Sequence, residues 1–153
     1  MSDRRFESMS DVLAFAVERE VEAARGYGRM AAQAATPGLR DLLLELKSEE
    51  EKHRRLLKKI KVARLEGAPA DRVPDLGLTD ALADLPLAPD MTFQELLIFA
   101  ARKEKKAEDL YAGLARRPEL AAHRKVFEFL AGQERTHKLR LEAEYETHVL
   151  SED

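Results

Sequence analysis

Six charged or imidazole side chains stand at positions where the surrounding sequence calls for apolar residues. Four are glutamates and two are histidines, and each interrupts a helically spaced stripe of Leu, Ala, Phe or Tyr. They are Glu20, Glu50, His53, Glu104, Glu134 and His137. A buried carboxylate without a partner is costly, and four that face each other also repel. Such a core requires a cationic group, and no Lys or Arg lies on these stripes at the same level.

The spacing of these residues favours a pair of metal ions as the cationic group. The pairs Glu50 with His53 and Glu134 with His137 are three residues apart, so both side chains of a pair share one helix face. One glutamate from each of two helices, with a Glu-x-x-His pair from each of two others, binds two iron or manganese ions in helical bundles. Oxygen-rich ligation with one imidazole per ion suits iron or manganese better than zinc or copper(I).

The sequence contains an internal repeat with an offset of 84 residues. Both the apolar stripes and the polar residues superpose at this offset. It places Glu20 on Glu104, Tyr27 on Tyr111, Glu50 on Glu134 and His53 on His137. A duplicated helical hairpin with a pseudo-two-fold axis through its core accounts for this match. The symmetry predicts two equivalent metal positions.

Hydrophobic spacing predicts one helical hairpin in the first half of the chain. The first helix is expected over residues 11–35, with Ser10 as its N-cap, after a short N-terminal segment over residues 1–10. Thr36 can cap a second helix that has Pro37 at its first position. The apolar stripe predicts that this second helix ends around Gly67.

A second hairpin follows after a long connection. Residues 66–91 hold four of the six prolines and show no long period, so we expect them to form a crossover. Thr92 and Glu95 have the form of a capping box at the start of the third helix, and Arg117-Pro118 separates it from the fourth. The prediction is an all-α, antiparallel four-helix bundle with one long connection, forming a single domain over residues 11–149.

The composition excludes several other classes of protein. The 153 residues suit one domain, and a net charge of −3 provides neither a basic footprint for nucleic acid nor a polybasic membrane signal. Cysteine is absent, which excludes disulfides, thiolate-bound zinc and iron–sulfur centres within this sequence. No apolar run approaches the roughly 20 residues of a membrane span, and no signal peptide is evident. We therefore expect a cytoplasmic protein that binds neither nucleic acid nor a membrane.

Nearly the whole chain resembles the rubrerythrin and ferritin-like di-iron proteins. Their pattern is Glu-x6-Tyr followed about 30 residues later by Glu-x-x-His, and it occurs here twice, beginning at Glu20 and at Glu104. The resemblance implies a ferritin-like bundle in which a long crossover joins the two duplicated hairpins. Full-length rubrerythrin also carries a four-cysteine rubredoxin module, which this sequence lacks. Electrons for any redox reaction must therefore come from another protein.

The resemblance also implies the roles of the site residues, which serve as both metal ligands and catalytic residues. It assigns terminal ligands to the first glutamate of each half, bridging ligands to the second, and one nitrogen ligand to each histidine. In that order they are Glu20 and Glu104, Glu50 and Glu134, and His53 and His137. Tyr27 and Tyr111 are expected to hydrogen-bond to ligand carboxylates.

Other polar residues are expected to stay outside this site. Glu108 is the one candidate for an additional carboxylate ligand near Glu104. His123 and His148 have no partner in the repeat, so we expect them at the surface or at helix ends. The charge runs over residues 49–55 and 102–109 mix both signs, which is typical of solvated helix faces.

The function implied by the resemblance is an oxidoreductase that reduces hydrogen peroxide or O2. Its cofactor is expected to be two iron ions, with manganese or a mixed iron–manganese pair as alternatives and zinc as a substitute acquired during purification. The expected partners are an external electron donor such as rubredoxin and a second copy of the chain in a homodimer. One alternative is a ferroxidase or iron-storage protein, and another is a non-enzymatic helical module stabilised by metal.

Overall fold

The computed structural model describes residues 8–60 and 90–151, with the backbone alone for residues 148–151. Over this part of the chain every element is helical, and no strand occurs. The elements are α1 (Met9–Gln33), α2 (Pro37–Lys58), α4 (Phe93–Ala115), the short 3-10 helix η1 (Pro118–His123) and α5 (Arg124–Ser151). The prediction of an all-α four-helix bundle is therefore confirmed.

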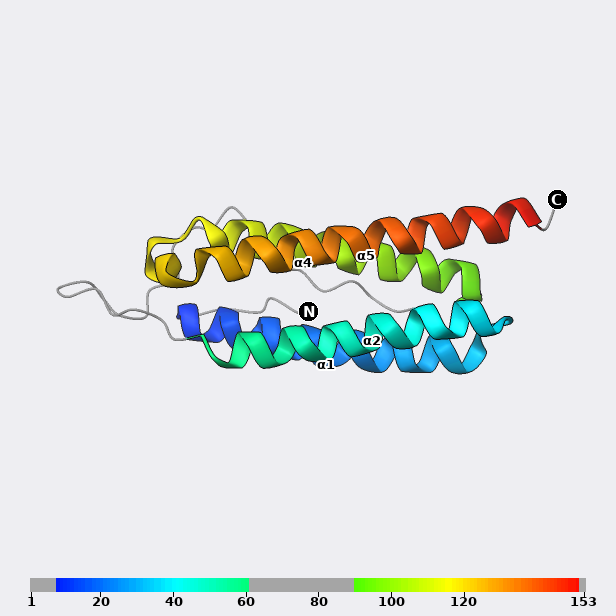
Figure 1. Cartoon of the computed structure of the whole chain (residues 1–153), viewed down its shortest axis with the longest axis horizontal. Coiled ribbons are helices and arrows are strands. Elements are labelled where there is room, and N and C mark those ends of the chain that lie inside the picture. Colours follow the sequence, from blue (N-terminus) through cyan, green and yellow to red (C-terminus); the bar gives the residue numbers. More distant parts are fainter. Residues whose placement is uncertain (1–7, 61–89, 152–153) are drawn as a thin grey trace.

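The four long helices form two hairpins that lie side by side (Figure 1). Helix α1 packs along α2, α4 packs along α5, and smaller contacts join α1 to α4 and α2 to α5. The hairpins therefore meet along a shared interface in the centre of the bundle. None of the described helices is long and apolar enough to cross a membrane.

The ends of the first hairpin differ in part from the prediction. Helix α1 begins at Met9 rather than at residue 11, and its N-cap is Ser8, whose Oγ accepts a 3.0 Å hydrogen bond from the amide of Asp11. Ser10, the predicted cap, lies inside the helix. The side chain of Met9 is buried in the core, so packing favours the longer helix.

Helix α2 begins as predicted but ends early. The hydroxyl of Thr36 accepts a hydrogen bond from the amide of Leu39, and Pro37 occupies the first turn. The predicted end near Gly67 is wrong, because the helix stops at Lys58, one residue after the last core side chain of its stripe, Leu57.

The start of α4 and the break before α5 agree with the sequence. Thr92 and Glu95 form the predicted reciprocal capping box, with hydrogen bonds of 3.1 Å and 2.9 Å. Pro118 opens η1, whose Leu120 is buried, and α5 follows at Arg124. The predicted crossover over residues 66–91 lies outside the described residues except at its last two positions.

Two apolar clusters fill the bundle on either side of a polar layer. One contains the first half of α1, the second half of α4, and residues such as Leu57, Phe127 and Leu130. The other contains the later part of α1, the start of α4, and residues such as Leu43 and Leu141. Burying each Leu or Phe contributes about 1.5–3 kcal/mol. This apolar packing at both ends can offset the cost of a polar layer in the middle.

Candidate metal centre

The polar layer consists of the six residues that the sequence singled out. Each of the six residues is no more than 2% exposed, and all four long helices contribute. They are Glu20 on α1, Glu50 and His53 on α2, Glu104 on α4, and Glu134 and His137 on α5. Residues from sequence positions more than a hundred apart thus meet in one buried cluster.

The cluster divides into two overlapping groups of four. Within each group, one potential ligand atom from every residue lies within 4.8 Å of all the others. The first group is Glu20, Glu50, His53 and Glu134, and the second is Glu50, Glu104, Glu134 and His137. Glu50 and Glu134 belong to both groups, so they lie where carboxylates could bridge two ions.

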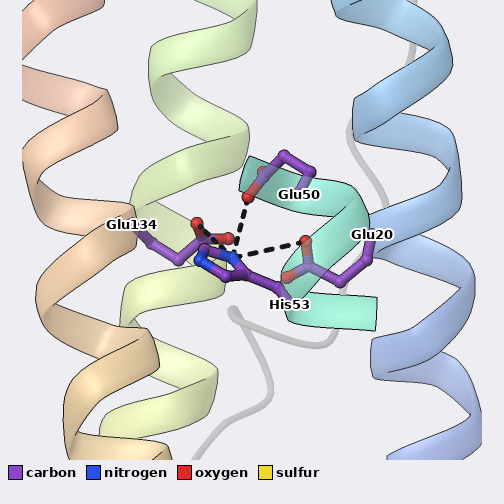
Figure 2. A group of neighbouring side chains, drawn as sticks. All are labelled: Glu20, Glu50, His53 and Glu134. Carbon is purple, nitrogen blue, oxygen red and sulfur yellow. Dashed lines mark ion pairs between the residues drawn. The ribbon is translucent and has the colours of Figure 1, made fainter. Parts of the chain in front are cut away.

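The first group is arranged around Nδ1 of His53 (Figure 2). This atom lies 2.9 Å from Glu50 Oε1, 3.3 Å from Glu134 Oε1 and 3.7 Å from Glu20 Oε2. The three carboxylates come from three different helices and approach the imidazole from different sides. Such convergence of oxygen atoms on one imidazole nitrogen is what a metal ion requires of its ligands.

The second group repeats this arrangement around Nδ1 of His137. The atom lies 3.3 Å from Glu134 Oε1, 3.4 Å from Glu104 Oε2 and 3.5 Å from Glu50 Oε1. The two imidazole rings are nearly parallel, with centroids 5.7 Å apart and an interplanar angle of 10°. The pseudo-two-fold symmetry of the sequence is therefore present in the geometry of the cluster.

One atom of every residue in the cluster lacks a hydrogen-bond partner among the described residues. These buried atoms are Oε2 of Glu20, Oε1 of Glu50, Nδ1 of His53, Oε2 of Glu104, Oε1 of Glu134 and Nδ1 of His137. They are the same atoms whose mutual distances define the two groups. Each unsatisfied buried polar atom costs about 1–3 kcal/mol. Metal coordination would satisfy all six together, so the donor set fits a two-ion centre.

The two tyrosines hold the outer oxygens of the terminal glutamates. The hydroxyl of Tyr27 donates to Glu104 Oε1 at 2.6 Å, and that of Tyr111 donates to Glu20 Oε1 at 2.5 Å. Each bond crosses between α1 and α4, and each leaves Oε2 of its glutamate facing the cluster. The tyrosines thus orient carboxylates from the opposite hairpin, as the resemblance implied.

Glu49 is a contributor to the site that the sequence analysis placed on a solvated face. Its Oε1 accepts a hydrogen bond from Nε2 of His137 at 2.7 Å, and its side chain is 24% exposed. A carboxylate accepts this bond, so Nε2 carries a proton and Nδ1 is the nitrogen that faces the cluster; a metal ion there would take the place of any proton on Nδ1. The one available signal was the position of Glu49 directly before Glu50.

Burial and mutual repulsion shift the ionisation of the cluster. Burial, followed by the charges of the neighbouring glutamates, raises the pKa of Glu50 and of Glu134 well above the ordinary value. Burial alone would lower the pKa of His53, but Glu20 and Glu50 outweigh it and raise that pKa to about 9. Protons therefore neutralise the cluster when no metal ion is bound.

Glu104 and His137 influence each other's ionisation in opposite directions. Burial acts to raise the pKa of Glu104, but the nearby imidazolium of His137, 3.4 Å from Oε2, lowers it below its ordinary value. Burial acts to lower the pKa of His137, whereas Glu104 and Glu49 raise it. The positive charge on this histidine, which neutralises Glu104, is lost when a metal ion binds.

The remaining candidate residues are not brought to the cluster. Glu108 belongs to neither group of potential ligands and lies 3.9 Å from Lys105 Nζ. His123 ends η1 and also belongs to neither group. The side chain of His148 lies outside the described residues. The expected solvated face on α4 is present, with Lys105 Nζ 3.0 Å from Asp109 Oδ1.

Comparison with known proteins supports the fold. No family model and no curated protein matches the sequence. A crystal structure at 2.30 Å resolution of a "putative ferritin-like diiron-carboxylate protein" from Thermotoga maritima is similar, with a TM-score of 0.66 and 21% identity. The match covers 94% of this chain and 97% of that one. The chain therefore has the ferritin-like four-helix fold, and its Glu/His cluster indicates a two-metal site.

Proposed function

We propose that this chain is a di-iron carboxylate oxidoreductase of the rubrerythrin type, which reduces hydrogen peroxide with electrons from an external donor. The observation that carries the proposal is the convergence of six unsatisfied buried donor atoms in two groups that share Glu50 and Glu134. A purely structural polar layer would be expected to satisfy its own hydrogen bonds. In this cluster, by contrast, six potential ligand atoms face each other without hydrogen-bond partners among the described residues.

Each ion would have one terminal glutamate and one histidine of its own. Glu20 and His53 would hold one ion and Glu104 and His137 the other, with the carboxylates of Glu50 and Glu134 shared. Carboxylate oxygens with a single imidazole suit iron or manganese. When bound, two iron ions supply the two electrons that convert one hydrogen peroxide, with two protons, into two waters.

The protein would fix the positions of the ligands and exclude bulk water from the site. The hydroxyls of Tyr27 and Tyr111 hold Glu104 and Glu20 from the opposite hairpin, which keeps the terminal carboxylates in place. Apolar clusters on both sides exclude bulk water from the layer. These 153 residues contain no cysteine that could hold an iron–sulfur centre, so rubredoxin is our proposal for the electron donor.

Anaerobic loading with two Fe(II) per chain, followed by hydrogen peroxide, tests this function. We expect consumption of about one peroxide per pair of ions, because each pair supplies two electrons. Addition of reduced rubredoxin should then restore consumption over repeated cycles. The variant Glu50→Ala should lose the activity, whereas Glu108→Ala, which changes a carboxylate outside the cluster, should retain it.

The same experiment distinguishes an oxidoreductase from an iron-storage protein. A storage protein would take up many irons per chain as ferric mineral, and reduced rubredoxin would not restore peroxide consumption. That outcome would contradict the proposal in favour of ferroxidase activity. Binding of metal without either behaviour would leave a helical module that metal only stabilises, which also contradicts the proposal.

A further inference from the structure

The two halves of the internal repeat differ around their histidines. At the 84-residue offset Glu49 corresponds to Gln133, so a carboxylate in one half stands where the other half has a neutral amide. Glu49 accepts the 2.7 Å hydrogen bond from Nε2 of His137. That bond fixes both the tautomer and the orientation of the His137 ring, and it increases the electron density available at Nδ1.

His53 has no corresponding partner. All of its polar contacts in the described part of the chain run through Nδ1, and Gln133 makes no hydrogen bond there. The ring instead meets the edge of Phe129, with centroids 6.5 Å apart, and Phe129 is itself 52% exposed. Among the described residues, no side chain therefore selects the His53 tautomer in the way that Glu49 selects that of His137.

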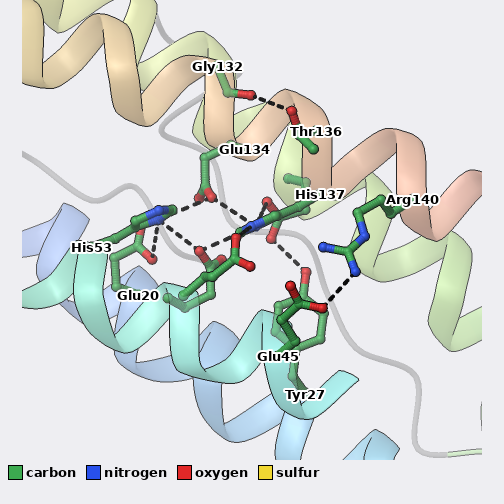
Figure 3. Close-up of polar contacts among 12 residues, drawn as sticks. Glu20, Tyr27, Glu45, His53, Gly132, Glu134, Thr136, His137 and Arg140 are labelled. Atoms are coloured by element: carbon green, nitrogen blue, oxygen red, sulfur yellow. Dashed lines mark hydrogen bonds and ion pairs between the residues drawn. The ribbon is translucent and has the colours of Figure 1, made fainter. Parts of the chain in front are cut away.

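Glu45 and Arg140 form a second polar contact that is present in only one half of the repeat. Arg140 Nη2 donates to Glu45 Oε2 at 2.9 Å and joins α5 to α2 on the His137 side of the cluster (Figure 3). At the repeat offset, Glu45 corresponds to Phe129 and Arg140 to Leu56. The His137 side therefore has polar bonds between α2 and α5, whereas the equivalent positions on the His53 side carry the apolar residues Phe129 and Leu56.

We infer that Glu49 is a positioning residue for His137, and that it makes the metal position of Glu104 and His137 the tighter of the two. The inference rests on the proposed two-metal site. The two ions then bind in order, first beside His137 and second beside His53, rather than at equivalent positions. Loss of such an outer partner of a metal-bound histidine lowers metal affinity by about 10–100-fold, which is the separation expected between the two steps.

Titration of the metal-free protein with Mn(II) tests this order without an activity assay. Isothermal titration calorimetry should resolve two binding steps whose dissociation constants differ by about 10–100-fold. The EPR signal of isolated Mn(II) should rise up to one equivalent and fall as the second ion couples to the first. Glu49→Gln keeps the size of the side chain. In this variant the dissociation constant of the tighter step should rise toward that of the weaker step.

Matched variants separate positioning from a general structural effect. Glu108→Gln, which changes a carboxylate outside the cluster, should leave both steps unchanged. In a His137→Ala background, Glu49→Gln should have no further effect on Mn(II) affinity, because Glu49 acts through the imidazole. Circular dichroism and melting temperature of each variant establish that it is folded.

The possible outcomes are distinct. If two ions bind with dissociation constants that differ no more than those of identical sites, the inference is overturned but the two-metal site stands. The same holds if the ratio of the two dissociation constants is unchanged in Glu49→Gln. An effect of Glu49→Gln that persists in the His137→Ala background would also overturn it. Absence of Mn(II) binding to the folded wild-type protein would contradict both the inference and the proposed function.

Discussion

In the metal-free protein, the free energy of unfolding should decrease as the pH rises from 6 to 9. In the metal-free cluster the pKa of His53 is raised to about 9, and burial raises the pKa values of Glu50 and Glu134. The folded state therefore binds more protons than the unfolded state over this range. Unfolding then releases protons, so the free energy of unfolding decreases with increasing pH.

The size of the effect follows from His53. Its pKa is raised from 6.5 to about 9, a shift that stabilises the folded state fully below pH 6.5 and no longer above pH 9. At 1.36 kcal/mol per pH unit, the loss between pH 6 and pH 9 amounts to about 3 kcal/mol from this residue alone. Glu50 and Glu134 act in the same direction, because both also bind protons more strongly when folded.

Urea unfolding in the presence of a chelator at several pH values measures this effect. The unfolding midpoint of the metal-free wild type should fall steadily from pH 6 to pH 9, and His53→Gln should make this fall smaller. With metal bound, ions replace the protons, so the fall should disappear. A metal-free midpoint that stays constant or rises over this range would refute the assigned protonation of the cluster.

Four further substitutions test individual contacts by urea or thermal unfolding of the metal-free protein. Tyr27→Phe and Tyr111→Phe each leave a buried carboxylate oxygen unpaired, so each should cost about 1–3 kcal/mol, and a loss in one variant only would contradict their equivalence. Thr92→Ala removes the capping box of α4 and should cost about 1 kcal/mol, whereas no change would mean that the cap is not formed in solution. Leu130→Ala should cost about 2–5 kcal/mol, and a much smaller loss would contradict its full burial.

The helices were predictable because their signals are local, but two of their ends were not. The capping box at Thr92 and the Thr36-Pro37 start depend on residues adjacent in sequence, and both are present. Ser8 and Ser10 are both competent caps, and the choice between them depends on burial of Met9 in the core. Tertiary packing made that choice, and it leaves no trace in the local sequence.

The six clustered residues could be found because the duplication marks each of them twice. Glu49 could not be found in this way, since its equivalent Gln133 breaks the repeat. Within its own segment Glu49 looks the same as Glu51, which is exposed, and its partner His137 lies 88 residues away. A polar contact made only through the packing of α2 on α5 requires the structure.

The central claim is that the buried cluster holds two metal ions, and anomalous diffraction from crystals grown with Fe(II) or Mn(II) tests it most directly. We expect two anomalous peaks per chain, one among Glu20, Glu50, His53 and Glu134, and one among Glu50, Glu104, Glu134 and His137. The absence of anomalous peaks at the cluster would contradict the two-metal site. Peaks found only at surface carboxylates such as Glu108 would contradict it as well.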